Sequence, residues 1–234
     1  MQTIGIAEAR SALGWWLEAG VDVPIQEESR DWLKGPLRPS SESPSAPTST
    51  NLIQPDQNTL TELQQWLAST AGLPLASATA KRILPTGPQK AAIMLLSDAP
   101  ALEDFVAGQP IGGEAWKLAK RMLAAIGIDS EQAYSASLSC FHNPGKKMSA
   151  AEREACAEIA RRHIRLAEPR RLLLLGDGPC LALLGKRLRE ARGHVHKIEG
   201  ARAVATFHPR QLVNRPLDKS LAWQDLLLLM EDES

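Results

Sequence analysis

The chain has 234 residues, of which 44% are hydrophobic, and it carries 27 basic and 27 acidic side chains. The apolar content excludes general disorder, and no apolar run reaches the roughly 18 residues that a membrane span needs. A chain of this length can form one substantial domain with an appendage. The amino terminus lacks the basic flank and apolar core of a secretory signal, so we expect a cytoplasmic protein.

The first part of the chain combines a short helical pattern with a linker. Residues 7–19, which include Trp15 and Trp16, have the apolar spacing of a helix that ends at Gly20. The following stretch is rich in Pro, Ser and Thr and cannot bury enough apolar surface to order itself. We therefore predict three segments: a helical extension over residues 1–34, a linker over residues 35–57 and a main domain over residues 58–234.

Strands and helices alternate through the main domain. Four apolar runs predict buried strands at residues 91–96, 133–139, 172–175 and 203–207. Helical patterns start near Leu60 and continue at about 114–126, 149–166, 179–191 and 217–230. Such alternation, with continuously apolar strands, is typical of a parallel sheet covered by helices on both faces. We expect an α/β fold, a three-layer α/β/α sandwich with a central, mostly parallel, four-stranded sheet.

The last predicted strand leads directly into His208 and Pro209. Proline cannot continue an internal strand, so His208 should stand at the carboxyl end of that strand. In open α/β sheets, ligands bind at this edge. The first predicted strand ends at the same edge and is followed by Asp98. An acid and a histidine at one edge could carry out general acid–base chemistry.

The net charge of zero conceals a basic middle block. Residues 140–219 carry 17 Lys and Arg against 8 Asp and Glu, whereas both flanking segments are acidic. Such a block can provide a phosphate-facing surface. The alternative is that Arg161, Arg162 and Arg165 line the solvated side of a helix. Composition leaves both interpretations open.

Motifs for other chemistries are weak. Gly176-Asp177-Gly178 begins like a dinucleotide-binding loop, but Leu181 stands where the third glycine is required. His194 and His196 have a spacing that could hold a metal, but surface histidines are the better interpretation. The three cysteines are an odd number, which argues against a disulfide framework and favours reduced thiols.

Two stretches of the main domain form a pattern, the first from Leu95 to Gly113 and the second from Ala205 to Leu226. In order and spacing they resemble family 4 of the uracil-DNA glycosylase superfamily, whose bacterial and archaeal enzymes carry an iron–sulfur cluster. The segment Leu118–Ile128 is also similar to the helix that follows the first motif of the family. The resemblance spans about residues 63–230.

The resemblance assigns roles to the two polar strand ends. In family 4, a Gly-Glu-Ala-Pro-Gly turn supplies backbone amides to the flipped base, and its acid positions or activates water. Here the turn contains Asp98, Ala99 and Pro100, with serine and alanine in place of the flanking glycines. The resemblance implies that Asp98 orients water and that His208 stabilises the leaving base as an anion.

Two base-recognition positions differ from the family pattern. Ile111 stands where the family has an aromatic side chain on which the extruded uracil stacks. Ala136 stands where the family has the asparagine that reads the amide edge of uracil, and only a shift of register would bring Ser137 or Asn143 to that position. The resemblance therefore leaves the choice of base largely unspecified.

The cysteine pattern of the family is incomplete. Cys140 and Cys156 have the separation of the later cysteine pair of the family, but the early pair falls on Thr70 and Leu73. Two thiolates cannot hold the usual cluster, so we expect that the cluster is lost and that no other metal is bound.

The resemblance also implies a DNA-contacting surface. Arg210 and residues 211–214 match the loop that enters the minor groove and props the duplex open. The further basic candidates for DNA contact are Lys146, Lys147 and Arg215. We expect a monomer that binds single- or double-stranded DNA and no membrane. Its amino-terminal helix could dock a protein partner or pack back on the core.

Three functions are compatible with these residues. The first is a DNA glycosylase that hydrolyses the N-glycosidic bond of uracil or a related deaminated base, as in base excision repair. The second is a catalytically degenerate relative that acts as a DNA-binding or partner-binding module. The third is a pocket for a free nucleobase or nucleotide. Whether the protein is an enzyme depends on which of them holds.

Overall fold

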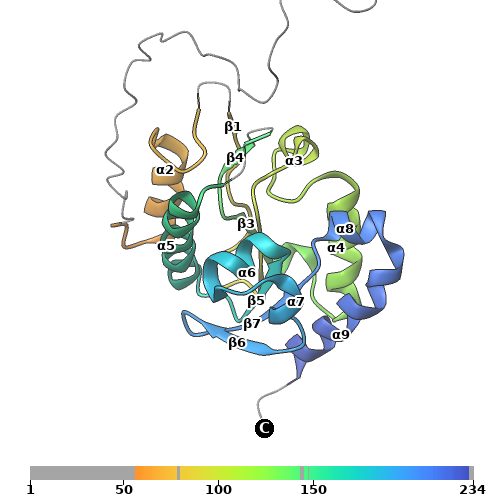
Figure 1. The fold of residues 1–234 in the computed structure, drawn as a ribbon. Coiled ribbons are helices and arrows are strands. Elements are labelled where there is room, and N and C mark those ends of the chain that lie inside the picture. Colours follow the sequence, from red (N-terminus) through yellow and green to blue (C-terminus); the bar gives the residue numbers. More distant parts are fainter. Residues whose placement is uncertain (1–55, 78–79, 143–144, 147, 232–234) are drawn as a thin grey trace, which may run out of the picture. The chain divides into compact units, whose positions relative to one another are not determined.

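The computed structural model, shown in Figure 1, describes four stretches of the chain: residues 56–77, 80–142, 145–146 and 148–231. All of them belong to the unit formed by residues 50–234. The predicted helical extension and nearly all of the predicted linker lie outside the described residues, so the predicted domain boundaries stay predictions. Two predicted site residues, Asn143 and Lys147, also lie outside them.

A five-stranded sheet with the order β3-β2-β5-β7-β6 forms the centre of this unit. Four strands run parallel, and β6 pairs antiparallel with β7 at one edge. The strands are β2 Ile93–Ser97, β3 Ala133–Ser137, β5 Arg171–Leu175, β6 Val195–Ile198 and β7 Ala201–Thr206. The mostly parallel sheet is confirmed, but the predicted number of four strands is wrong.

The unpredicted strand, β6, lacks the apolar signature of the others. Only Ile198 of its four residues is buried, and Val195 and Lys197 are exposed. An edge strand pairs on one side only and can face solvent, so it needs no continuous apolar run. Pairing with β7, and not a hydrophobic pattern, therefore defines this strand.

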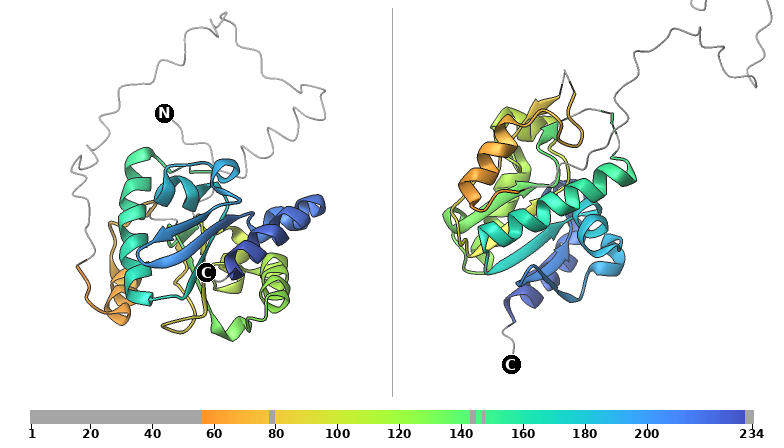
Figure 2. Two further views of the ribbon diagram at one scale, coloured as in Figure 1. Left: turned by 90° about the horizontal axis from the view of Figure 1, so that it is seen from below. Right: turned by 90° about the vertical axis from the view of Figure 1, so that its left-hand side faces the viewer.

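Helices cover both faces of the sheet, so the predicted three-layer α/β/α sandwich is confirmed. One core layer packs under α5, α6 and α7 and the other under α4 and α9, as Figure 2 shows. The helices are α2 Leu60–Ser69, α3 Leu102–Ala107, α4 Gly113–Ala125, α5 Ala150–Ala167, α6 Asp177–Leu184, α7 Leu188–Ala191, α8 Pro209–Asn214 and α9 Lys219–Met230. Two 3-10 turns, η1 Ser130–Gln132 and η2 Pro216–Asp218, and a short antiparallel pair, β1 Lys81–Arg82 with β4 Phe141–His142, complete the described structure. None of these helices combines the length and apolar character needed to span a bilayer.

Strand β2 shows why the central strands are continuously apolar. All five of its residues are buried. Met94 and Leu96 enter the core layer on one face, whereas Ile93 and Leu95 enter the layer on the other. Successive side chains of a strand point to opposite faces, so a strand covered on both faces must be apolar at every position.

Local signals begin and end the helices. Capping boxes begin two of them, formed by Thr59 with Glu62 at α2 and by Ser149 with Glu152 at α5. The single helix predicted at residues 179–191 is wrong, because Gly185 adopts the left-handed conformation, with φ of 66°, and ends α6. Helix α7 begins only after this break.

The segment at residues 211–214, predicted as a loop, lies in a helix. Pro209 occupies the first turn of α8, where a missing N–H is tolerated, and His208 is the N-cap residue. The proline that ends β7 therefore also begins α8. This places His208 at a strand-to-helix junction.

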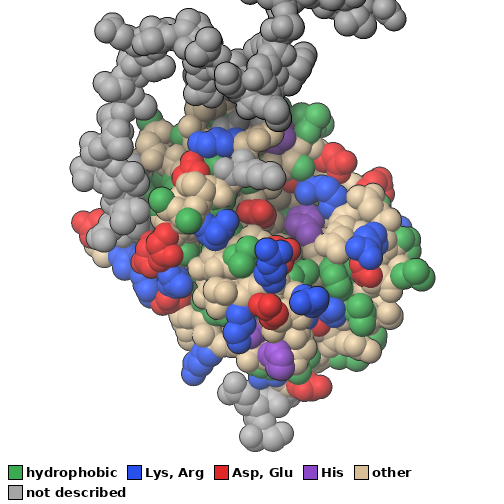
Figure 3. Space-filling view, viewed as in Figure 1, with side chains coloured by type: hydrophobic (Ala, Val, Ile, Leu, Met, Phe, Trp, Pro, Cys, Tyr) green, Lys and Arg blue, Asp and Glu red, His purple; other side chains and the backbone are tan. Residues whose placement is uncertain are grey.

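The basic block does not form one continuous positive surface on the face seen in Figure 3, where basic and acidic side chains are mixed with one another. Two of the arginines on α5 form ion pairs: Arg161 with Glu158 at 2.9 Å and Arg165 with Glu199 at 2.8 Å. These contacts favour the interpretation of α5 as a solvated helix face.

A buried polar network ties α2 and α5 to the sheet. The Tyr134 hydroxyl lies 2.7 Å from Nε2 of His163 and accepts a hydrogen bond of 2.9 Å from the Gln64 amide. Burial lowers the pKa of His163 to about 4 and raises the pKa of Tyr134 to about 12. Both groups are therefore neutral near pH 7.

This network predicts loss of stability in acid. His163 has a pKa of about 4 in the folded protein and an ordinary value of 6.5, so the unfolded chain binds the extra proton between these values. The free energy of unfolding should fall as pH drops from about 6.5 to about 4, by on the order of 3 kcal/mol from this group. Denaturant unfolding at stepped pH measures it, and His163→Gln should flatten the profile. A variant with the slope of the wild type would contradict the assignment.

Candidate active site

The parallel strands bring Asp98 and His208 to one edge of the sheet. Asp98 follows β2, His208 follows β7, and β5 lies between these two strands. Because neighbouring strands are spaced by about 4.8 Å, the backbones of the two residues lie roughly 10 Å apart. The turn from β5 into α6, at Gly176 to Gly178, fills the space between them.

Asp98 lies directly against the first turn of α6. A Cβ atom placed on Gly178 would lie 2.4 Å from Cγ of Asp98 and 2.6 and 2.7 Å from its two carboxyl oxygens. These distances are shorter than any real contact of a methyl group, so a side chain at this position would force the carboxyl group of Asp98 to move. On the other side of the same turn, a Cβ placed on Gly176 would lie 3.9 Å from Cβ of His208.

The surroundings of Asp98 shift the pKa of its carboxyl group. Part of its side chain is exposed at the edge of the sheet, but loss of hydration on its other sides raises the pKa of the carboxyl above the usual 3.8. Asp177 also raises it, whereas the Ala99 backbone N–H and the charge of Arg153 act in the opposite direction. A carboxylate with a raised pKa accepts a proton more readily, as general base chemistry requires.

His208 is held as a neutral imidazole in a defined tautomer. Its Nδ1 accepts a hydrogen bond of 3.1 Å from the backbone N–H of Arg210, so the ring proton resides on Nε2. Burial, and then the positive charge of Arg210, lowers the pKa of His208 to about 4, while Asp104 raises it. Near pH 7 the ring therefore offers an N–H donor without a net charge.

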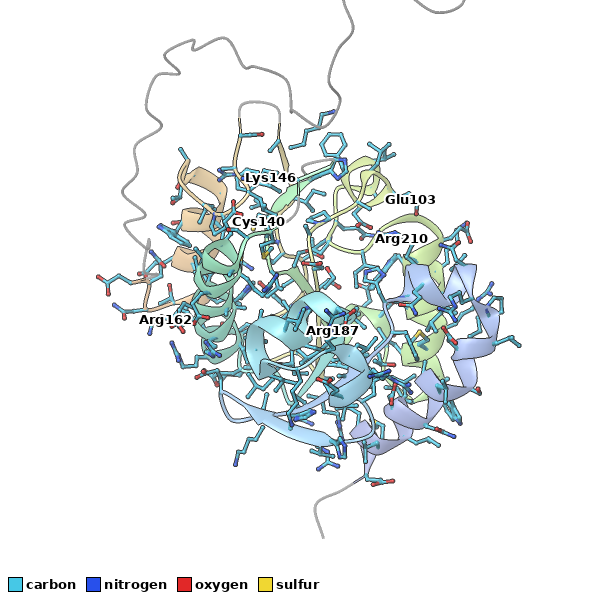
Figure 4. All side chains as sticks on the ribbon, in the orientation of Figure 1. Glu103, Cys140, Lys146, Arg162, Arg187 and Arg210 are labelled. Carbon is cyan, nitrogen blue, oxygen red and sulfur yellow. The ribbon has the colours of Figure 1, made fainter. Side chains whose placement is uncertain are left out.

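Asp104 connects the segments around this edge. Its side chain is only 1% exposed, and its two oxygens accept hydrogen bonds from the backbone N–H groups of Ala101, at 2.7 Å, and Gly112, at 2.6 Å. Arg210 completes the set with an ion pair of 2.7 Å. Figure 4 shows Arg210 between α3 and α8, on the side of Glu103. Sequence reasoning assigned no role to Asp104, because its ion-pair partner, Arg210, is 106 positions away in the chain.

The predicted base-recognition residues do not all reach the edge. Ile111 is 1% exposed and packs in the core beneath α4, and Ala136 is fully buried in the opposite core layer. Ser137 is half-buried, and its hydroxyl lies 3.0 Å from the hydroxyl of Ser97. The substrate-binding roles of all three stay predictions.

The other predicted site residues have these positions. Ala99 is half-buried, and Pro100 is buried with its carbonyl accepting a hydrogen bond of 2.8 Å from Nδ1 of His142. Lys146 forms an ion pair of 2.8 Å with Glu152, and Arg215 is exposed and lies 3.4 Å from Asp218. With Arg210 engaged by Asp104, every described basic candidate for DNA contact has an acidic neighbour. Their roles in DNA binding stay predictions.

Comparison with known proteins agrees with this geometry. A family model described as the uracil DNA glycosylase superfamily matches residues 84–227, which include Asp98, Asp104 and His208. The chain belongs to this superfamily. A type-4 uracil-DNA glycosylase of Archaeoglobus fulgidus is 26% identical over 141 residues, which cover 56% of this chain and 71% of the relative. A type-4 uracil-DNA glycosylase of Pyrobaculum aerophilum is 24% identical over 153 residues, which cover 61% and 78%.

These findings confirm the resemblance to family 4 and identify the chain as a glycosylase-like, family 4-like member of the superfamily. Its candidate active site is therefore the edge that carries Asp98 and His208. Family 4 implies an iron–sulfur cluster. Whether this chain could hold one depends on the residues at the four cysteine positions of the family.

The residues at that position do not fit a cluster. Leu73, at one early cysteine position, is 5% exposed and packs with other apolar side chains, among them Leu63 and Phe141. The guanidinium of Arg82 donates hydrogen bonds to the carbonyls of Leu67, at 2.5 Å, and Thr70, at 2.7 Å. A cation and apolar side chains thus surround the position. Four thiolates are the usual ligand set of such a cluster.

The two matching cysteines are protonated thiols. Burial raises the pKa of Cys140 to about 11 and that of Cys156 to about 12. Within the described part of the chain, no three His, Cys, Asp or Glu side chains come together as a metal site. These cysteines have the environment of small buried apolar residues.

The contact between Gly178 and Asp98 predicts a specific coupling. Gly178→Ala should displace the carboxyl group into solvent, lower its pKa toward the ordinary 3.8 and cost about 1–3 kcal/mol of stability through overpacking. Carboxyl-detected NMR titration of Asp98 and denaturant unfolding measure the two effects.

A double-mutant cycle provides the control. In an Asp98→Ala background, the methyl group of Gly178→Ala meets no carboxylate, so it should be neutral or slightly stabilising in the helix. Equal destabilisation in both backgrounds would show that the contact has no effect.

Proposed function

We propose that this protein is a DNA glycosylase that hydrolyses the N-glycosidic bond of uracil or a related deaminated base. One observation carries the proposal. A neutral histidine that carries its ring proton on Nε2 and a carboxyl with a raised pKa flank the same turn, at the edge of the sheet where ligands bind in such folds.

His208 is suited to stabilise the departing base. As the bond between the sugar and the base breaks, negative charge collects on a carbonyl oxygen of the base. The Nε2–H of His208 donates a hydrogen bond to that oxygen. Because the low pKa of His208 leaves the ring neutral, the ring has no additional proton to transfer, and the base leaves as an anion. The hydrogen bond from the Arg210 N–H to Nδ1 fixes the orientation of the ring.

Asp98 is suited to deliver water. The sugar becomes positively charged as the base leaves, and a carboxylate nearby stabilises that charge. Asp98 accepts a proton from the attacking water while the new carbon–oxygen bond forms at the anomeric carbon. The contact with Gly178 limits the positions that the carboxylate can adopt.

The base-recognition positions support broad base choice. Ile111 and Ala136 are buried and offer neither an aromatic face nor a hydrogen-bonding edge. Sites without polar readers discriminate weakly among similar bases. DNA is the substrate that we propose, with Lys146 and Arg215 as exposed basic neighbours of the edge. The monomeric state, the partner of the amino-terminal helix and the cytoplasmic location stay predictions from the sequence.

The same burial favours a second candidate function. Within the described residues, neither Ile111 nor Ala136 offers an accessible stacking or reading side chain, as expected of a catalytically degenerate relative that binds DNA or a protein partner. This candidate keeps the fold and the charged groups but predicts no bond cleavage.

An oligonucleotide panel tests the proposed activity. Single- and double-stranded DNA containing uracil, hypoxanthine or xanthine is incubated with the protein and then broken with hot alkali at abasic sites. We expect strand breaks at one or more of these bases and a loss of roughly a hundredfold or more in His208→Ala. Asp98→Asn should also lower the rate. His194→Ala, which alters an exposed histidine, serves as the matched control.

The panel also separates the two candidates. Absence of breaks at all three bases, combined with salt-dependent DNA binding, would reject the glycosylase and support the degenerate module.

We also propose that the protein functions without an iron–sulfur cluster, because the two early cysteine positions hold Thr70 and Leu73 and both remaining thiols are protonated. Protein purified without oxygen should be colourless and contain far less than one equivalent of iron. Cys140→Ala should leave both readings unchanged. Brown protein whose colour and iron disappear in Cys140→Ala would overturn this proposal.

A further inference from the structure

Three basic residues form a row across neighbouring strands at the opposite edge of the sheet. Arg171, at the start of β5, pairs with Arg202 of β7, and Arg202 pairs with Lys197 of β6. Directly paired residues project from the same face, so the three side chains lie side by side with a strand spacing of about 5 Å. Like charges directly opposite one another destabilise a sheet.

The row lines a pocket of about 570 Å³. Arg170 also lines it, and Glu231 is the only acidic side chain among its described lining residues. The volume is within the ordinary range of small-molecule sites.

The basic residues of the row differ in their contacts. Arg202 donates a hydrogen bond of 3.0 Å to the carbonyl of Leu228 in the last turn of α9, so it has a structural role. Within the described residues, the side chains of Arg171 and Lys197 form neither a hydrogen bond nor an ion pair. Each of these two charges therefore lies beside the positive charge of Arg202 and has no compensating contact of its own in that part of the chain.

We propose that this pocket binds a phosphate-bearing anion. The guanidinium of Arg171 can contact two phosphate oxygens at once, and the Lys197 ammonium adds a mobile positive charge. Such a ligand would offset the repulsion within the row. Strands of five residues separate this pocket from Asp98 and His208 by roughly 17 Å, so the site is distinct from the proposed excision site and does not depend on it.

Phosphate chemistry has two sources here, a free polyphosphate and the backbone of DNA. The full chain is titrated with inorganic tripolyphosphate and, separately, with a short undamaged DNA duplex. The double variant Arg171→Ala/Lys197→Ala should bind one of these probes at least about tenfold more weakly than the wild type. Lys120→Ala, which removes an exposed charge on α4, should bind both as the wild type does.

The probe that the double variant binds more weakly identifies the source of the phosphate. Loss of tripolyphosphate binding alone assigns a free polyphosphate. Weaker duplex binding, with a salt dependence reduced by about two counterions, assigns a DNA backbone. Equal affinities of the wild type and the double variant for both probes overturn the proposal.

Thermal unfolding gives an independent reading. Without anion, the double variant should have a higher Tm than the wild type, because the repulsion within the row is removed. Tripolyphosphate or duplex should raise the Tm of the wild type but not that of the variant. A lower Tm of the variant without anion would show that these cations serve stability, and would overturn the proposal.

Discussion

The buried carboxylate of Asp104 fixes the geometry on which the candidate site depends. A charge that is 1% exposed is tolerated only with full pairing, and here it is paired with Arg210 and with the backbone N–H groups of Ala101 and Gly112. Ala101 ends the turn that begins with Asp98, and Arg210 lies two residues after His208. One side chain therefore holds the two proposed catalytic groups in a fixed relation, although they come from opposite ends of the domain.

Around this anchor, loss of hydration gives His208 and Asp98 complementary properties. Loss of hydration keeps His208 neutral and makes the carboxyl of Asp98 a stronger base, so one donates a hydrogen bond while the other accepts a proton. Ile111 and Ala136, by contrast, are buried in the core. The site thus combines groups suited to bond cleavage with a surface that provides few side chains for reading a base.

In the region where family 4 enzymes hold their cluster, apolar packing and hydrogen bonds occupy the position of the two early cysteines. Leu73 packs among apolar side chains, and Arg82 satisfies the carbonyls of Leu67 and Thr70 that would otherwise remain unpaired. Hydrogen bonds and apolar contacts there connect α2 to the rest of the domain. At the far edge of the sheet, the row of Arg171, Arg202 and Lys197 places charge where stability alone would disfavour it.

Apolar patterns in the sequence are enough to predict the four parallel strands and the sheet edge that carries Asp98 and His208. Strands buried on both faces must be apolar throughout, and parallel strands end at one edge, so both features follow from local patterns. Tertiary structure alone decided β6, which has no continuous apolar pattern of its own. It also decided the pairing of Asp104 with Arg210 and the register that aligns the three cations. These features depend on contacts between residues far apart in the chain, which no local pattern records.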